Sequence, residues 1–278
     1  MRRWWVGMAG CLLAGAALAG GPTAEQKQVE ASMVVTGSIG VDPQGTVSAY
    51  TIDHPEKLPP PIVELIGKSI PGWAFQPVLR DGKPVAAKAD MSLRLVARPA
   101  GDGKFQIAVR SAWFGDPAQG IRQEKSSPPR YPRQAIRGRV EGTVYLALRI
   151  DRQGNVADVA ARQVDLRVTE DENEMKHWRD VFTEASVDAA RAWTFTPADA
   201  SDHAPYRIAI EPVSYELSSG PVAKRPVYGQ WETYVPGPLE PVPWFDADQM
   251  LAGGVDALPG DGVYGAPSLS LLTPLVHD

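Results

Sequence analysis

The sequence predicts an α+β protein built from two tandem small modules of strand-strand-helix-strand order, followed by a Pro/Gly-rich C-terminal tail. In each module an antiparallel sheet is expected to pack on one helix. Three observations support this. Apolar and polar residues alternate from Gly142 to Ile150, and turn residues follow at Asp151–Gly154, which is typical of a β-hairpin. A 3.6-residue period then places Val181, Phe182, Ala185, Ala189 and Trp193 on one helical face. The same order of signals occurs earlier in the chain.

The earlier copy repeats both the turn and the end of the helix. Asp42-Pro-Gln-Gly45-Thr-Val47 resembles Asp151-Arg-Gln-Gly154-Asn-Val156, and Trp73-Ala-Phe75-Gln-Pro77 resembles Trp193-Thr-Phe195-Thr-Pro197. Between them, a helix is expected after Pro59–Pro61, where a helix start tolerates proline, with Ile62, Leu65, Ile66 and Ile70 on its apolar face. A further hairpin is expected from Met91 to Val109.

These signals give the expected domain boundaries. The modules are predicted at residues 33–115 and 128–217, with a linker at residues 116–127 and a tail at residues 218–278. The second copy is longer because of a charged run from Asp165 to Lys176, which we expect to be a loop, so its helix is expected from Asp180.

The last strand of the second module is expected at Tyr206–Leu217, on the edge of its sheet. Tyr206, Ile208 and Ile210 have one parity, but Val213 and Tyr215 have the other. A bulge at Pro212 would explain this change, and proline is tolerated at a sheet edge because it has no N–H to donate.

The second module resembles the C-terminal domain of the TonB family. The matching features are Tyr131-Pro132, Ala135, Gly142, Val144, Asp151, Gly154, Val156, the alanine-rich helix and the Trp193-x-Phe195-x-Pro197 ending. The first module lacks a Tyr-Pro segment and is the more divergent copy. The Ser-Gly pair that the family usually shows after its second strand is replaced here by Gln163-Val-Asp165. The resemblance implies a periplasmic domain that captures an extended segment of an outer-membrane transporter, partly by strand addition.

Residues 1–19 have the pattern of a secretory signal peptide. Arg2 and Arg3 precede an apolar stretch from Trp4 to Leu18, and Ala17-Leu-Ala19 is a small-residue cleavage site. The apolar stretch is shorter than the ~20 residues of a spanning helix, which favours cleavage. Lipid attachment at Cys11 is a weaker alternative, because Cys11 precedes most of the apolar stretch. Cleavage would remove the only cysteine.

Composition gives no sign of catalysis or nucleic-acid binding. The formal charge is −5, so no general attraction to nucleic acid is expected. The four histidines are not paired at metal-ligand spacing, and Glu172-x-Glu174-x-x-His177 is interpreted as a solvated charged segment. No nucleophile elbow or phosphate-binding glycine loop occurs. We therefore expect that the protein is not an enzyme and that it binds neither a metal ion nor a cofactor.

The candidate partner-binding residues lie in two places. One set surrounds the Tyr-Pro segment, within a cluster of arginines that is either a solvated face or a docking surface for an acidic partner: Arg130, Tyr131, Pro132 and Arg133. The other set lies on the expected edge strand: Arg207, Ala209 and Glu211.

The leading functional prediction is an exported, non-enzymatic periplasmic protein that uses its TonB-like modules for protein binding or envelope scaffolding. Its partner would be an outer-membrane transporter or another envelope protein. The alternative is an atypical energy transducer that keeps its N-terminal segment as an inner-membrane anchor; membrane contact is expected only in that case. A periplasmic enzyme with dispersed catalytic residues is a third, less favoured alternative.

The tail gives two opposing signals. Its prolines, glycines and acids favour disorder, but its aromatic residues favour packing. We expect Val227–Phe245 to lie extended against a module, anchored by its rings, and residues from Asp246 onward to be ordered only in patches.

Overall fold

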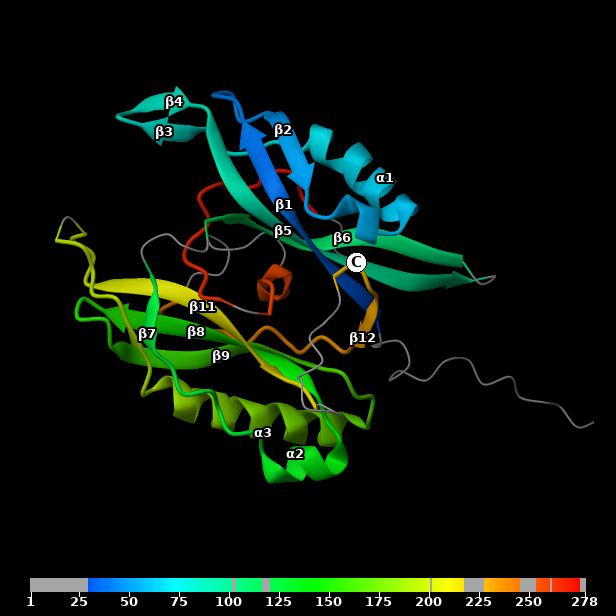
Figure 1. Cartoon of the computed structure of the whole chain (residues 1–278), viewed down its shortest axis with the longest axis vertical. Coiled ribbons are helices and arrows are strands. Elements are labelled where there is room, and N and C mark those ends of the chain that lie inside the picture. Colours follow the sequence, from blue (N-terminus) through cyan, green and yellow to red (C-terminus); the bar gives the residue numbers. More distant parts are fainter. Residues whose placement is uncertain are drawn as a thin grey trace, which may run out of the picture.

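Two antiparallel sheets face each other, and each carries helices on its outer side (Figure 1). The computed structural model describes residues 30–101, 104–116, 121–200, 202–217, 228–245, 254–260 and 262–275. The expected signal peptide and part of the expected linker lie outside these ranges. Part of the C-terminal tail lies between the sheets, including Val242, Phe245, Val255, Ala257, Leu258 and Tyr264, so the layers there are helix, sheet, tail, sheet and helix.

The first sheet has the strand order β12-β1-β5-β6, and β2 also pairs with β1. Its strands are β1 (Glu30–Val41), β2 (Val47–Ile52), β5 (Ala87–Gly101), β6 (Lys104–Gly115) and β12 (Glu232–Tyr234), and its helix is α1 (Pro60–Ser69). The alternation of β1 and β5 turns one face of the sheet toward α1. The core between them contains, among others, Met33, Val35, Ile39, Ile62, Ile66, Met91, Leu93 and Leu95.

The second sheet has the order β11-β8-β9, with β8 (Gly142–Asp151), β9 (Val156–Leu166) and β11 (Tyr206–Tyr215). Its helix α3 (Glu172–Ala190) covers one face. The predicted hairpin is confirmed, because the four alternating apolar residues of β8 are fully buried against α3. Of the predicted helical face, Val181 and Phe182 are buried, whereas Ala185 and Ala189 are partly buried. Trp193 is buried but lies after the end of α3, and Ala190 and Phe195 are fully buried as well. The predicted α+β class, with sheets packed on helices, is therefore confirmed.

The two predicted turns have the same geometry. Asp42 Oδ1 accepts hydrogen bonds from the N–H groups of Gln44 and Thr46, and Asp151 Oδ1 accepts from Gln153 and Asn155. The turn glycines have φ of +83° at Gly45 and +90° at Gly154. Each accepts a hydrogen bond on its carbonyl from the aromatic residue after the helix, from Phe75 at 2.8 Å and from Phe195 at 2.7 Å. The turns therefore fix each hairpin to the segment that follows its helix.

Several short elements complete the modules. They are β3 (Val78–Arg80), β4 (Lys83–Val85), β7 (Gln123–Lys125), α2 (Arg133–Gly138), β10 (Thr194–Phe195) and the 3₁₀ turns η1 (Pro55–Lys57), η2 (Ile70–Gly72) and η3 (Val255–Ala257). The β3–β4 hairpin turns at Asp81-Gly82, which both have positive φ. Asp-Gly between two short strands is a strong hairpin signal that the sequence analysis missed.

The expected start of the second helix was wrong. Helix α3 begins at Glu172, and its N-cap Asp171 accepts hydrogen bonds from the N–H groups of Asn173 and Glu174. Two acidic residues of the expected loop, Glu172 and Glu174, lie in the first turn of the helix, where negative side chains are favourable near the helix dipole. Most of the remainder of that run is the end of β9 and its connection to the helix.

The expected bulge at Pro212 is also wrong. β11 pairs with β8 in one continuous register from Tyr206–Asp151 to Tyr215–Gly142. Both faces of the strand are buried: Ala209, Val213 and Tyr215 face α3, whereas Ile208 and Ile210 face the tail. A strand buried on both faces has apolar residues of both parities, so no slip is needed.

The described parts of the tail pack on both modules. Val227–Phe245 was expected to lie against one module; residues 228–245 of it lie against both, with Trp231 on the first core and Val235 and Phe245 buried. From Asp246 onward, order only in patches was expected; in the described ranges 254–260 and 262–275, buried residues include Val255, Leu258, Tyr264, Leu269 and Leu275. Apolar burial therefore outweighs the proline and glycine content.

Candidate protein-binding edge of the second sheet

β11 is an edge strand, and its outer side is the candidate binding edge. β8 takes one side of β11 along its whole length. Ile210 turns its N–H and C=O away from β8, because both groups bond to Tyr264. The direction of the backbone groups alternates along a strand, so the N–H and C=O groups of the even-numbered residues of β11 point away from β8. Pro212 is one of them, so this position offers an acceptor but no donor.

A segment of the tail lies along part of this edge. The N–H of Ile210 donates to the Tyr264 carbonyl at 2.8 Å, and the N–H of Tyr264 donates back at 2.8 Å. Near the other end, a Cβ on Gly260 would lie 3.3 Å from Ser214 Oγ. Tyr264 and Gly260 therefore lie beside Ile210 and Ser214, respectively, in antiparallel order.

The side chain of Tyr264 fills a pocket between the sheets. It is 5% exposed, and its ring meets the Trp113 ring edge-on at a centroid distance of 5.2 Å. The apolar cluster around this pair joins both sheets and the tail: Tyr145, Ala147, Ile210, Val242, Phe245, Val255, Ala257 and Leu258. Trp113 belongs to β6, so the pocket is formed by both modules.

The tail also pairs with the other edge of this sheet. Leu166 and Val235 exchange two backbone hydrogen bonds, of 3.0 and 2.7 Å, and the N–H of Glu240 donates to the Arg162 carbonyl at 2.8 Å. Gly237 approaches so closely that a Cβ there would lie 2.2 Å from the Val164 carbonyl oxygen. The tail thus covers part of both edges of the second sheet.

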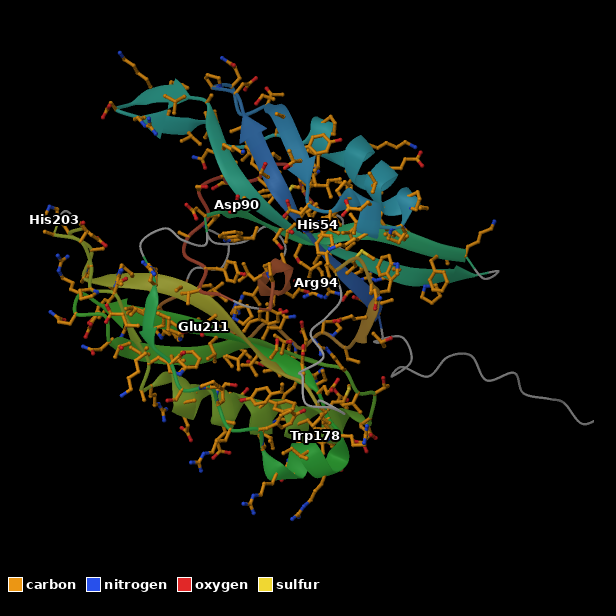
Figure 2. The ribbon with its side chains drawn as sticks, viewed as in Figure 1. His54, Asp90, Arg94, Trp178, His203 and Glu211 are labelled. Atoms are coloured by element: carbon orange, nitrogen blue, oxygen red, sulfur yellow. The ribbon has the colours of Figure 1, made fainter. Side chains whose placement is uncertain are left out.

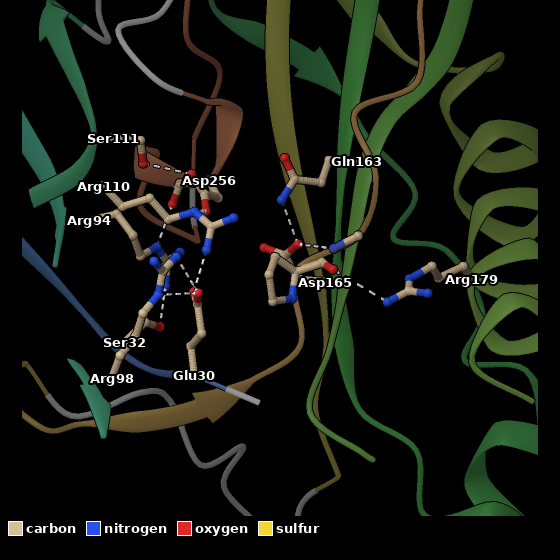
Figure 3. Close-up of polar contacts among 12 residues, drawn as sticks. Glu30, Ser32, Arg94, Arg98, Arg110, Ser111, Gln163, Asp165, Arg179 and Asp256 are labelled. Carbon is tan, nitrogen blue, oxygen red and sulfur yellow. Dashed lines mark hydrogen bonds and ion pairs between the residues drawn. The ribbon is translucent and has the colours of Figure 1, made fainter. Parts of the chain in front are cut away.

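A partly buried charge cluster holds the tail between the modules (Figure 3). Glu30 pairs with Arg98 at 2.6 Å and with Arg110, and Ser111 Oγ donates to the η3 residue Asp256 at 2.6 Å. Arg94 donates to the Asp256 carbonyl at 2.7 Å and to the Tyr145 hydroxyl at 3.2 Å, so it bridges the sheets, as its position in Figure 2 shows.

A second buried acid lies on the β9 side of the same region. Asp165 Oδ1 accepts hydrogen bonds from the Gln163 side chain at 2.7 Å and from the Gly237 N–H at 3.0 Å. Its other oxygen has no partner among the described residues. Burial, and secondarily the nearby Asp256 charge, raise the pKa of Asp165.

The predicted residues around the Tyr-Pro segment separate into two environments. The Tyr131 hydroxyl donates to the Val140 carbonyl at 2.6 Å, and its ring packs edge-on against Phe182 and Tyr215. Pro132 is the N-cap residue of α2. Tyr131 is thus a packing residue that closes the helix side of the core, whereas Arg130 and Arg133 are exposed.

The predicted residues of β11 face the helix side, away from Tyr264. Ala209 is fully buried, and Arg207 donates to the Thr196 carbonyl. Glu211 accepts hydrogen bonds from Gln123 Nε2 at 3.1 and 3.3 Å. The structure does not bring these residues together with Tyr131 or Arg133. The strand was predicted correctly, but the side chains of the odd-numbered residues point toward the helix and not toward the tail.

Glu211 gives a testable pH dependence. Its burial raises its pKa to about 7, and the hydrogen bond from Gln123 offsets only part of that shift. In the unfolded chain the pKa is near 4.5. As the pH rises from about 4.5 to about 7, the unfolded state therefore loses its proton first, and the free energy of unfolding falls.

We expect Glu211→Gln to remove part of this fall, up to about 3 kcal/mol. Denaturant unfolding at pH 5 and pH 8 measures it. Glu184→Gln, at an exposed position on α3, is the matched control and should leave the pH dependence unchanged. Equal slopes for Glu211→Gln and wild type would contradict the assignment.

The described residues contain no group of three side chains suited to hold a metal ion. Glu172, Glu174 and His177 are exposed on the first turns of α3. His54 and His203 lie on different modules (Figure 2). Within the same ranges, no helix has the length and apolar character that crossing a membrane requires.

The comparisons with known proteins give one match. Residues 127–165 match the family model of the Gram-negative bacterial TonB protein C-terminal, which confirms the resemblance for this part of the second module. The matched range covers the Tyr-Pro segment, α2, β8 and most of β9. The match supports a protein-interaction role in the Gram-negative envelope. No curated protein and no solved structure matches the chain.

Proposed function

Because residues 127–165 carry the TonB C-terminal match, we propose that this chain is an exported, non-enzymatic periplasmic protein that binds a partner along the outer edge of β11. The partner is an outer-membrane transporter or another protein of the envelope. Domain boundaries at residues 33–115 and 128–217 are part of this proposal, as is the removal of residues 1–19.

The observation that carries the proposal is the Ile210–Tyr264 pair. A sheet edge that holds an extended segment through reciprocal backbone hydrogen bonds has the geometry of strand addition. Main-chain bonds supply affinity in this mode, and pockets for alternate side chains supply specificity. The buried Tyr264 ring beside Trp113 is such a pocket occupant.

Photo-crosslinking at the two ends of β11 tests the proposal. Tyr206 and Ser214 are both exposed, and both are even-numbered residues whose backbone groups point away from β8. A photoreactive residue at either position, in cells, is expected to join the chain to one envelope protein. The same residue at Asp188, exposed on α3, is the control. Identical products from β11 and from Asp188, or none from β11, would refute binding at this edge.

The TonB match also supports a second candidate, an energy transducer that keeps Trp4–Leu18 as an inner-membrane anchor. Sequencing the N-terminus of the protein isolated from the envelope separates the two candidates. A start at Gly20 supports the exported protein, and a retained Met1–Leu18 segment supports the transducer.

A further inference from the structure

We propose that residues 260 and 262–264 are an internal substitute for the partner, which displaces them and places an aromatic side chain in the Trp113–Ile210 pocket. This inference rests on the proposed function. It specifies the partner as an extended segment, antiparallel to β11, with an aromatic residue opposite Ile210 and a small residue two positions before it.

The backbone register defines this recognition pattern. Tyr264 pairs with Ile210, and continuing the antiparallel order places Gly262 opposite Pro212 and Gly260 opposite Ser214. Pro212 has no N–H, so the segment receives no donor at its middle position. Gly262 has φ of +122°, outside the range of a regular strand. A partner that displaces the tail has to replace the two backbone hydrogen bonds between Ile210 and Tyr264.

The pocket indicates that the tail is an imperfect occupant. The Trp113 side chain is 3% exposed, yet among the described residues its indole N–H has no acceptor. A buried donor without a partner is unfavourable, and a partner that offers an oxygen there gains a hydrogen bond that the tail does not make. The ring of Tyr264 supplies the apolar contact but leaves this donor unused.

The rest of the tail keeps the displaced segment attached. η3 is held by Ser92, Arg94 and Ser111, which bond to Ala257 and Asp256. On the other side, the N–H of Ser268 donates to the Phe114 carbonyl at 2.9 Å. Residues 260 and 262–264 can thus leave β11 while both flanks stay bound, and they compete with the partner at a high effective concentration.

A labelled peptide with the sequence of residues 256–268 tests this recognition in the whole chain. The chain with Tyr264→Ala loses the internal aromatic residue, and we expect it to bind the peptide at least tenfold more tightly than wild type, measured by fluorescence anisotropy. A peptide with Tyr264→Ala should bind at least tenfold more weakly. Leu272→Ala, at an exposed tail position, should bind like wild type. Equal binding of both peptides would overturn the proposal.

A disulfide clamp gives a second, independent test. Ser214→Cys with Gly260→Cys places two thiols where a Cβ at 260 lies 3.3 Å from the 214 side-chain atom, which suits a disulfide. Oxidation should lower peptide binding at least tenfold and abolish the crosslink from Tyr206, and reduction should restore both. The clamp retains Tyr264, so it remains decisive if Tyr264→Ala does not fold.

The outcomes separate the two proposals. A crosslink from Tyr206 that is equally strong in the oxidised and reduced clamp overturns tail displacement and leaves partner binding at β11 intact. Peptide binding that responds to the clamp, with no crosslinked envelope protein in either state, supports the pocket and refutes the proposed function.

Discussion

Leu269→Ala is expected to lower the free energy of unfolding by about 2 to 5 kcal/mol, because it opens a cavity in the core of the first module. The side chain is 2% exposed and packs in the same cluster as Met33, Ile62 and Leu93. Denaturant unfolding measures the change.

The tail itself supplies the control. Leu272, three residues later, is 62% exposed, and Leu272→Ala should change the free energy of unfolding by no more than about 0.5 kcal/mol. Similar losses for the two leucines would mean that residues 269–275 do not pack as described.

The dependence of the first module on the tail follows from its strand pairing. The N–H of Gln76 donates to the Ser270 carbonyl at 2.9 Å, and that of Leu272 donates to the Ala74 carbonyl at 2.8 Å. In the second module, β10 makes the equivalent pairing with β7, from the segment just before that module. In the first module the pairing segment thus comes from the C-terminal tail, whereas in the second module it comes from the residues just before the module.

Gly154→Ala is expected to destabilise the protein by roughly 3 to 5 kcal/mol, the sum of backbone strain and a lost hydrogen bond. At φ of +90° a side chain is strained, and a Cβ would lie 1.9 Å from the Phe195 carbonyl oxygen. The turn would have to move away from β10, which breaks the bond from the Phe195 N–H to Gly154. Thermal and denaturant unfolding measure the effect.

Two further glycines make this prediction specific. Gly45 has the same environment, with a Cβ 2.0 Å from the Phe75 carbonyl oxygen, so Gly45→Ala should cost a similar amount. Gly82 also has positive φ, but no atom lies within 4 Å of its Cβ position, and Gly82→Ala should cost only about 1 kcal/mol. If all three variants lose the same free energy of unfolding, the contact between the turn and the aromatic segment does not contribute to stability.

Local sequence patterns predicted the elements well and their limits less well. The alternation of β8 and the turn at Asp151–Gly154 predicted the hairpin, because one buried face and one tight turn are encoded within a few residues. The start of α3 was misplaced because its charged first turn has the composition of a loop. The bulge at Pro212 was wrongly predicted because apolar residues of both parities were interpreted as a shift in register. In β11 they reflect burial of both faces of the strand.

The candidate site was predicted only in part. β11 was correctly expected at a sheet edge, and the aromatic residues of the tail were correctly expected to pack. The pairing of Tyr264 with Ile210 and of Val235 with Leu166 was not predicted, because these contacts use backbone groups that any sequence has. The pocket at Trp113 draws residues from both modules and the tail, and no local period brings such residues together.

The same distant pairing sets the order in which the chain can fold. The Ala74 N–H bonds to the Thr273 side chain, 199 positions away, so the first module lacks part of its core until almost the whole chain has been synthesised. Contacts of such separation carry a large loop-closure cost and slow folding. A chain emerging from its N-terminus would therefore keep its first half open until the last residues arrive, and refolding kinetics should be limited by that late docking.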